Sequence, residues 1–426
     1  MSNKTTYNHS ILLAGFIGNV VEWYDFALYG YMASFLSRLF FPSEDHLASL
    51  LATYGVFAAG FVMRPLGSAL FGWMGDTVGR SRTMLISVSL MALPTLALGL
   101  LPGYASAGVL APILLVVVRL VQGLSVGGEF SSSVTYLVET ADPDSRGYAG
   151  SWANMGSMTG MLLGSGIAAA LTTFLDHQAV HDWAWRVPFL FGGIIGTIAI
   201  ILRRNLPASE HFQRHVRSRC ESSPLIEAFT DNLTQTLKAV LFASAYGVLF
   251  YFSLVYLPNW ASDQAGYDLG FAMQLNTAAT ALLLVCIPLS GWISDRYLRR
   301  TRFIMSAVGL MFLAAYPLFQ WMHETGTVLA LLSTQIILAL LLAVPLGSAP
   351  ALFVEMFPTR DRLSGYSVSY NIGLGVVGGA TPMIATGLIK ITGSGLSPCL
   401  FLMLMALAGV VGISLIRDRS REPLQS

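Results

Sequence analysis

The sequence has 426 residues, of which 54% are hydrophobic and only 11% are charged, whereas soluble domains carry about 25% charged residues. This composition excludes an ordinary soluble domain and indicates a membrane protein. The 24 basic and 23 acidic residues nearly balance, which speaks against nucleic acid as a partner. The three cysteines, Cys220, Cys286 and Cys399, lie too far apart for a disulfide framework or a metal site.

Apolar stretches of the length needed to span a bilayer, about 20 residues, recur along the whole chain. The segment before the first of them, MSNKTTYNHS, carries no signal-peptide cleavage site, so we expect a short cytoplasmic tail. The stretches predict an all-α membrane protein with twelve transmembrane helices, near residues 11–36, 47–74, 83–101, 108–139, 148–175, 185–202, 237–260, 270–293, 303–322, 327–355, 365–389 and 396–416.

Basic residues are concentrated in alternate loops of this scheme. With both termini in the cytoplasm, most of the Lys and Arg residues fall in cytoplasmic loops, as the positive-inside rule requires. The opposite loops hold mainly acids and histidines. The charge distribution therefore predicts an even number of helices and two cytoplasmic termini.

One long polar segment divides the chain into two related halves. It predicts an N-terminal six-helix bundle at 1–202, a cytoplasmic linker at 203–236 and a C-terminal six-helix bundle at 237–426. GWMGDTVGRSR (72–82) matches GWISDRYLRRTR (291–302), and ETADPDSRGY (139–148) matches EMFPTRDRLSGY (355–366). Two matches at nearly the same offset indicate two pseudo-symmetric bundles with a substrate site between them, near the bilayer midplane.

Two motifs in the N-terminal half resemble those of the major facilitator superfamily. They are G-x-x-x-D-x-x-G-R-x-R and R-x-x-Q-G-x-x-x-G, with their defining residues at Gly72, Asp76, Gly79, Arg80 and Arg82, and at Arg119, Gln122, Gly123 and Gly127. The stretches GNVVEWYDF, GFVMRPLG and VQGLSVGGE are similar to the metabolite:proton symporter family, whose members include bacterial carriers of proline and betaine, 2-oxoglutarate, citrate and shikimate.

This resemblance implies the twelve-helix major facilitator fold in a bacterial inner membrane, and inward transport driven by protons. The osmosensing betaine carriers of this family have an extended C-terminal coiled coil. The present sequence ends shortly after the last predicted helix, so an osmosensor role is not expected.

Few ionisable residues lie deep within the predicted helices: Glu22, Asp25, Arg64, Arg119 and Glu129. Each costs about 2.5–3.5 kcal/mol at a helix centre, so each needs a partner or water. Two interpretations remain open. The charges could form buried ion pairs that lock helices together, or they could line a hydrated functional cavity.

Helical spacing favours the cavity. Arg119, Gln122 and Glu129 share one helix face, and Glu22, Asp25 and Tyr29 share another. Two carboxylates one turn apart are suited to hold a proton between them. We therefore expect Asp25 first, with Glu22 and Glu129, to couple protons to transport.

Substrate contacts are expected from both halves. Arg119 would bind a substrate carboxylate, while Arg64 would bind substrate or pair with Glu22. A cationic end could meet aromatic rings by cation–π contact. The remaining candidates are Gln122, Trp23, Tyr24 and Tyr29 in the first half and Tyr251, Tyr370 and Asn371 in the second, where simple packing is an equal alternative.

The repeated loop motifs predict a gate. Their charges lie at cytoplasmic helix ends, where they can form ion pairs and meet helix dipoles, stabilising the outward-open state. The alternative is that they only set topology. The gate candidates are Asp76, Arg80, Arg82, Glu139, Arg146, Asp295, Glu355 and Arg362.

Together these observations predict a monomeric carrier that takes up a small carboxylate-bearing metabolite with a proton by alternating access. An organic anion ranks slightly above a zwitterion such as proline or betaine. Proton-driven efflux would use the same fold, and a channel fits the duplicated halves less well. We find no enzyme motif and expect no cofactor besides the coupling proton. The partners would be substrate, proton and lipid.

Overall fold

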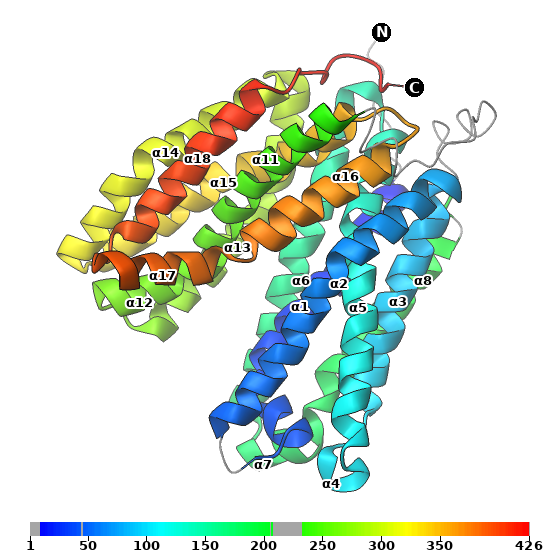
Figure 1. The fold of residues 1–426 in the computed structure, drawn as a ribbon, viewed down its shortest axis with the longest axis vertical. Helices are drawn as coiled ribbons and strands as arrows, with labels where there is room; N and C mark the ends of the chain where they lie inside the picture. Colours follow the sequence, from blue (N-terminus) through cyan, green and yellow to red (C-terminus); the bar gives the residue numbers. More distant parts are fainter. Residues whose placement is uncertain (1–8, 44–45, 205, 208–231, 426) are drawn as a thin grey trace.

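The protein is described by a computed structural model that covers residues 9–43, 46–204, 206–207 and 232–425 (Figure 1). Within these ranges the secondary structure is entirely helical. The first half contains six long helices: α1 (His9–Phe40), α2 (His46–Thr77), α3 (Arg80–Leu100), α5 (Leu110–Thr140), α6 (Arg146–Phe174) and α8 (Arg186–Arg204). Short turns join them: α4 (Tyr104–Ala107), η1 (Pro143–Ser145), α7 (His177–Ala179) and η2 (Val180–Ala184).

The second half also contains six spans, two of which are interrupted. α11 (Leu233–Tyr251) continues through the π-helical turn η3 (Phe252–Tyr256) into α12 (Leu257–Ala265), and α16 (Arg362–Tyr370) continues through the π-helical turn η4 (Asn371–Gly378) into α17 (Thr381–Thr392). The other spans are α13 (Leu269–Arg296), α14 (Arg300–Thr325), α15 (Val328–Met356) and α18 (Ser397–Ser414).

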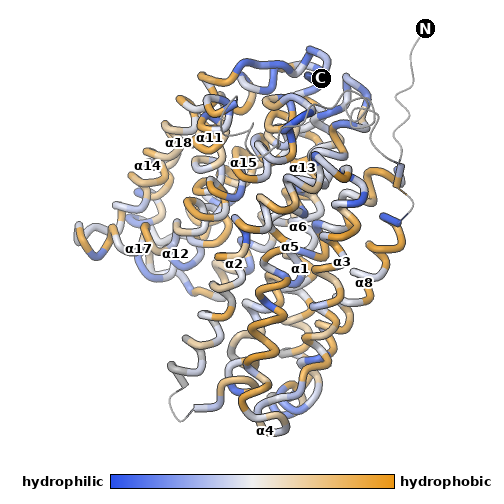
Figure 2. The backbone as a smooth tube through the Cα atoms, turned by 45° about the vertical axis from the view of Figure 1, so that its right-hand side comes forward, coloured by the Kyte–Doolittle hydropathy of each residue, from blue (hydrophilic) through white to orange (hydrophobic). Residues whose placement is uncertain are grey.

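The twelve predicted helices are confirmed. Ten spans among the described residues are long and apolar enough to cross a membrane. The other two, α2 and α6, have 32 and 29 residues and pack against α5 and α1. Figure 2 shows apolar residues along the lengths of the helices and polar residues gathered toward their ends.

The two halves repeat the same helix pairing. In the first half α1 packs on α6, α2 on α5 and α3 on α8. In the second half the corresponding pairs are α11 with η4, α13 with α15, and α14 with α18. Helices at equivalent places in the two repeats therefore have equivalent neighbours. The predicted boundaries at 202 and 237 remain a prediction, since most of the linker, residues 208–231, lies outside the described part.

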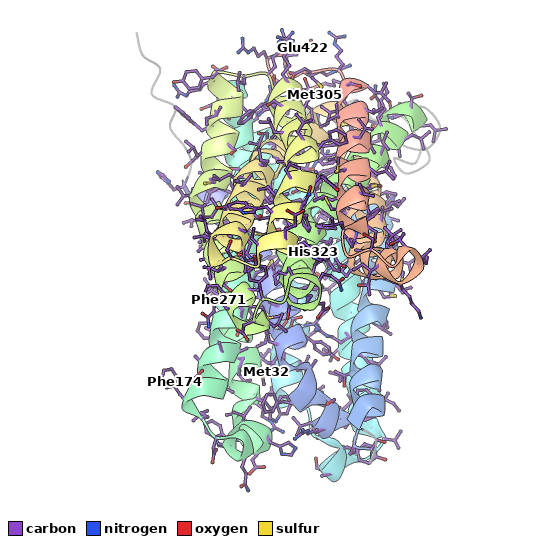
Figure 3. The ribbon with its side chains drawn as sticks, turned by 90° about the vertical axis from the view of Figure 1, so that its left-hand side faces the viewer. Met32, Phe174, Phe271, Met305, His323 and Glu422 are labelled. Carbon is purple, nitrogen blue, oxygen red and sulfur yellow. The ribbon has the colours of Figure 1, made fainter. Side chains whose placement is uncertain are left out.

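The two bundles converge at one end of the molecule and diverge at the other (Figure 1). At the convergent end α2 and α5 pack on α16, and α6 packs on α13 and α15. We call this the closed end; Met305 and Glu422 lie there in Figure 3, whereas Met32 and Phe174 lie toward the opposite, open end. That the closed end faces the cytoplasm remains a prediction.

Candidate functional site

The site is built around Asp25, which is fully buried in the middle of α1. Its Oδ2 atom accepts a hydrogen bond from Arg119 Nη1 of α5 at 2.5 Å. The same guanidinium lies over the Tyr29 ring, with its carbon 3.7 Å from the ring centre, and donates to Gln122 Oε1 at 2.7 Å. Four residues predicted from helix faces thus meet in one cluster.

Two neutral groups bind the other oxygen of Asp25. Thr95 Oγ1 of α3 and Gln122 Nε2 of α5 both donate to Asp25 Oδ1 at 2.9 Å. The carboxylate therefore accepts three hydrogen bonds, one of them from a cation, which is the arrangement that stabilises a buried charge. Sequence reasoning missed Thr95. The available signal was a hydroxyl residue in the otherwise apolar second half of this helix.

A small cavity of about 30 Å³ adjoins this cluster. All of its lining residues come from the N-terminal bundle: Asp25, Phe26, Gly60, Arg64, Met91, Arg119, Gln122, Gly123 and Val126. α2 and α5 approach closely here because Gly123 has no side chain. A Cβ atom at this position would collide with the main chain of Gly60. The cavity places one acid and two arginines around a space that, in this conformation, has room for about a water or two.

Glu22 lies apart from Asp25, where the two bundles meet. It is 3% exposed, and its Oε2 atom has no hydrogen-bond partner within the described residues. The charges that act on it are those of Arg64, Glu129 and Arg203. The expectation of a proton shared between Glu22 and Asp25 does not fit this conformation, because both oxygens of Asp25 bind other groups.

Arg64 of α2 lies near side chains of both bundles. Its guanidinium carbon lies 5.4 Å from the centre of the Phe26 ring, and its charge acts on Tyr251 of α11. The Glu22 charge also acts on Tyr251 and on Tyr370 of α16. An acid, an arginine and two phenols from different bundles therefore gather near the centre of the molecule.

Glu129 belongs to a separate ion pair with Arg203. Glu129 Oε1 lies 2.6 Å from Arg203 Nη2, and Oε2 accepts from Arg203 Nη1 at 2.9 Å. Ser87 and Ser133 also donate to this carboxylate. Both charges are buried, so the geometry corresponds to a pair that locks helices and corrects the expectation that Glu129 faces the hydrated cavity.

Arg203 itself was expected in the polar linker but lies in the last turn of α8. It donates to the main-chain oxygens of Ala14 in α1 and Met84 in α3, both at 2.9 Å. A side chain at Gly18 would collide with this pair. A partial signal was visible in the sequence, since an arginine at the end of a predicted helix can serve as the counter-ion of an intramembrane acid.

The three aromatic candidates of the first half, Trp23, Tyr24 and Tyr29, have different surroundings. Tyr24 is fully buried and donates to the Pro188 oxygen of α8 at 2.6 Å, so it points away from the cavity and its expected substrate contact is not supported. Trp23 instead packs edge-on against Phe250 of α11, with ring centres 5.6 Å apart. Tyr29 contacts Arg119 and donates to Thr53 O at 3.1 Å.

The second-half candidates close the space between the bundles. Tyr370 stacks on Phe130 of α5 at 4.8 Å. Asn371 Nδ2 donates to Gly127 O of α5 at 2.8 Å, and Ser367 Oγ donates to the same oxygen at 3.0 Å. These residues join the bundles at the level where Gly127 lies against the main chain of α2.

At the closed end, each bundle supplies one carboxylate that binds the first turn of a helix in the other bundle. Asp76 accepts from the main-chain N–H groups of Leu363 at 3.2 Å and Ser364 at 2.8 Å, at the start of α16. Asp295 accepts from Gly147 and Tyr148, both at 2.8 Å, at the start of α6. A carboxylate is favoured at a helix N-terminus by the free N–H groups and the helix dipole.

Ion pairs surround both carboxylates. Two glutamates, Glu139 and Glu355, each pair with an arginine of the other bundle. Glu139 binds Arg362 of the other bundle at 2.8 Å, and Glu355 lies 3.5 Å from Arg146. Within its own bundle Glu139 also lies 3.2 Å from Arg80.

Arg300, which sequence reasoning did not select, binds Glu355 at 2.9 Å and Asp295 at 2.8 Å. Arg80 holds the equivalent place in the other bundle, 3.0 Å from Asp76. Aligning the two copies of the motif could have identified Arg300. The second copy has one extra residue before its R-x-R, so Arg300 and Arg302 correspond to Arg80 and Arg82. Arg82 is exposed and takes part in none of the gate contacts described here, so its expected gate role is not supported.

The C-terminal segment 415–425 crosses the closed end (Figure 1). Arg146 donates to Glu422 O at 2.8 Å, and Arg362 donates to Gln425 O at 2.7 Å. Asp418 accepts from the main-chain N–H and hydroxyl of Thr301 at 2.9 and 2.8 Å. Burial alone would raise the pKa of Asp418, but hydrogen bonds from Ser420 and Thr301 outweigh it and hold this pKa below its ordinary value.

Comparison with known proteins gives the family. The sequence model of the Major Facilitator Superfamily matches residues 15–332. The chain is 32% identical to the proline/betaine transporter of Salmonella typhimurium, over 97% of this chain and 84% of that protein. It is 31% identical to the citrate-proton symporter of Klebsiella pneumoniae (96% and 92% covered) and 33% identical to the alpha-ketoglutarate permease of Escherichia coli (88% and 86%).

Solved structures show the same fold. The proton:xylose symporter XylE matches with a TM-score of 0.80 at 17% identity, over 98% of this chain and 97% of that one. The transporter FucP in its outward conformation matches with a TM-score of 0.72 at 14% identity, over 96% and 100%. The relatives are transporters, and their likeness together with the apolar helices indicates a multi-pass protein of the inner membrane. The chain therefore belongs to the major facilitator superfamily and, within it, to the metabolite:proton symporter family that its motifs predicted.

Proposed function

We propose that this protein takes up a small carboxylate-bearing metabolite together with a proton, by alternating access between its two bundles. The observation that carries the proposal is the buried Asp25–Arg119 pair at the wall of the cavity. A buried carboxylate and guanidinium that share hydrogen bonds are costly to separate, and breaking such a pair by removing one partner costs about 3–5 kcal/mol. The pair can separate only if each charge is neutralised or gains another partner at the same time.

Protonation supplies that exchange. When Asp25 takes up a proton it loses its charge, and the Arg119 guanidinium needs another anion. A substrate carboxylate in the adjoining cavity would meet this need, since an arginine binds carboxylates with two parallel hydrogen bonds. Proton and substrate would then bind together and leave together, which is symport.

An organic anion is the first candidate substrate, because Arg64 and Arg119 both line the cavity. The names of two relatives, a citrate-proton symporter and an alpha-ketoglutarate permease, support this class.

A zwitterion such as proline or betaine is the second candidate, and a specific observation favours it. Glu22 and the rings of Trp23 and Tyr251 lie where the bundles meet, close enough to Arg64 for a molecule with both a carboxylate and a cationic end. Acid and aromatic groups are the usual partners of an ammonium group. The relatives named as proline/betaine transporters support this class.

The closed end would act as the cytoplasmic gate of an outward-open state. Asp76, Asp295 and the crossed pairs of Glu139 and Glu355 would hold the bundles together until proton and substrate are bound. We propose that the protein works as a monomer, since each bundle supplies half of this gate.

Transport by purified protein in proteoliposomes tests the proposal. Labelled citrate, alpha-ketoglutarate, proline and glycine betaine would be added outside, with and without an inward proton gradient, and with a protonophore as a control. We expect one class to accumulate only with the gradient. Accumulation driven by an outward gradient would favour efflux instead, and uptake that ignores the gradient would refute proton coupling.

A further inference from the structure

The two oxygens of Asp25 have different surroundings. Oδ2 faces the Arg119 guanidinium, while Oδ1 faces the neutral groups of Thr95 and Gln122. The orientation of the Gln122 amide is fixed by the same contacts, because its oxygen must face the guanidinium and its nitrogen the carboxylate. A proton that enters from the cavity is therefore expected to bind Oδ1, away from the positive charge.

A protonated Oδ1 changes from an acceptor into a donor. A buried O–H group without an acceptor is costly, as is any unpaired polar group away from water. Gln122 Nε2 cannot accept a hydrogen bond, since an amide nitrogen only donates. Of the two groups bound to Oδ1, only the Thr95 hydroxyl can both donate and accept.

Thr95 Oγ1 has two acceptors for its single hydrogen. It lies 2.9 Å from Asp25 Oδ1 and 2.9 Å from the main-chain oxygen of Met91, one turn earlier in α3. Gln122 Nε2 also donates to Thr95 Oγ1 at 2.9 Å. Rotation about one bond is enough to move the hydrogen from the carboxylate to the Met91 oxygen, and no heavy atom needs to shift.

We propose that Thr95 is a positioning residue that lets Asp25 change its protonation state while every polar group bound at Oδ1 keeps a partner. With Asp25 ionised, Thr95 donates to Oδ1 and accepts from Gln122. With Asp25 protonated, Thr95 donates to Met91 O and accepts from both Asp25 and Gln122, which uses its two lone pairs. The proton on Oδ1 comes from the cavity, and Thr95 keeps its own. This inference rests on the proposed coupling through Asp25.

Among the side chains that the structure describes on the helices around Asp25, none places a competing acceptor charge at Oδ1. α3 contributes Thr95, and α8 contributes Gly192, which packs against the Thr95 methyl group. α6 faces this part of α1 with Gly160 and Gly164. The charged and titratable groups nearby are Arg119 on α5, Arg64 on α2, and Glu22, Tyr24 and Tyr29 on α1 itself.

The test compares Thr95→Val with Thr95→Ser in proteoliposomes. Valine keeps the shape of threonine and removes the hydroxyl, while serine keeps the hydroxyl. The control is Thr83→Val, since Thr83 is a buried threonine of α3 whose hydroxyl is seen to bond the Gly79 oxygen. The probe is whichever labelled compound of the four the wild-type protein accumulates, measured as gradient-driven uptake against pH and as exchange at equal pH on both sides.

In Thr95→Val the ionised form of Asp25 loses the Thr95 hydrogen bond and keeps those of Arg119 and Gln122, whereas the protonated form is left with a buried O–H that has no acceptor. On this proposal the O–H without an acceptor is the larger cost, so the protonated form is penalised more. We expect the pH of half-maximal uptake to fall by about one unit, a tenfold change in proton concentration, with exchange kept within about threefold. Thr95→Ser and Thr83→Val should follow the wild-type pH profile, and retained exchange shows that each variant is folded.

A wild-type pH profile for Thr95→Val, or the same shift in Thr95→Ser, would overturn the inference. Asp25→Asn is measured in parallel to separate the two proposals. If Asp25→Asn still accumulates substrate with the gradient, coupling through Asp25 itself is refuted. If Asp25→Asn loses accumulation and Thr95→Val matches wild type, only the role of Thr95 is refuted.

Discussion

Replacing Asp76 with asparagine should shift the protein away from the conformation described here. Asp76 accepts two main-chain hydrogen bonds from α16, and its side chain is fully buried. Hydrogen bonds to a charged group contribute about 1.5–3 kcal/mol, against about 0.5–1.5 kcal/mol for neutral ones. Asparagine also has one oxygen in place of two, so one N–H loses its acceptor. The closed end should lose about 2–4 kcal/mol.

A change of that size alters the ratio of two conformations by about 30- to 1,000-fold. The assay is pulsed electron-spin distance measurement between labels at the open end. Phe174 of α6 and Ile391 of α17 are suitable positions, because they are 84% and 83% exposed and lie in different bundles. The native cysteines would first be replaced. In Asp76→Asn the distance between these labels should shorten as the open end closes.

Arg82→Gln serves as the matched control, because Arg82 is exposed and belongs to the same motif. It should leave the distance distribution unchanged. Asp295→Asn, at the equivalent place in the second repeat, should act in the same direction as Asp76→Asn. If Asp76→Asn gives the wild-type distribution, the carboxylate does not hold the bundles together and the gate hypothesis is wrong.

Three other predictions concern separate parts of the chain. Asp25→Asn should abolish gradient-driven accumulation and retain exchange; accumulation at the wild-type level would contradict the coupling role. Arg203→Gln should lower the free energy of unfolding by about 3–5 kcal/mol, because Glu129 is left buried without its counter-ion. The measurement is the thermal midpoint in detergent, which should fall. Adding Glu129→Gln to this variant should recover part of the loss. Asp418 has a pKa below its ordinary value in the folded protein, so it stabilises the C-terminal segment above about pH 4 and loses this effect as pH falls through the depressed pKa. The protection of amides in 415–425, measured relative to the intrinsic exchange rate at the same pH, should fall at that low pH in the wild type and already at neutral pH in Asp418→Asn, and equal protection at neutral pH would contradict this anchor.

The sequence predicted the helices well because spanning a bilayer imposes a length and composition that a single chain displays directly. It also predicted that Arg119 and Gln122 share one helix face and that Asp25 and Tyr29 share another, since residues three or four positions apart lie on the same face whatever the tertiary structure. These features depend on local geometry alone.

Contacts between distant helices were harder to predict. Thr95 reaches Asp25 only because α3 and α1 have a particular rotation and height, and neither quantity is visible in one helix. Arg203 looked like a linker residue because α8 continues further than its apolar stretch. The ion pairs that Glu139 and Glu355 form across the bundles depend on how the two bundles dock. Internal repeats indicate that there are two bundles, but not their relative orientation.

The carboxylates of Asp76 and Asp295 bind main-chain N–H groups, and this choice has a consequence for how the chain can vary. Nineteen of the twenty amino acids carry that N–H group, so mutations at Leu363 and Ser364 can change the side chain and still leave the donor in place. Proline is the exception, since it would delete the donor outright. The donors therefore place no demand on the side chains of these turns, and the limits there come from packing: Leu363 and Ser364 are fully buried, and a side chain at Gly147 would collide with Arg300 and the main chain of Gly291.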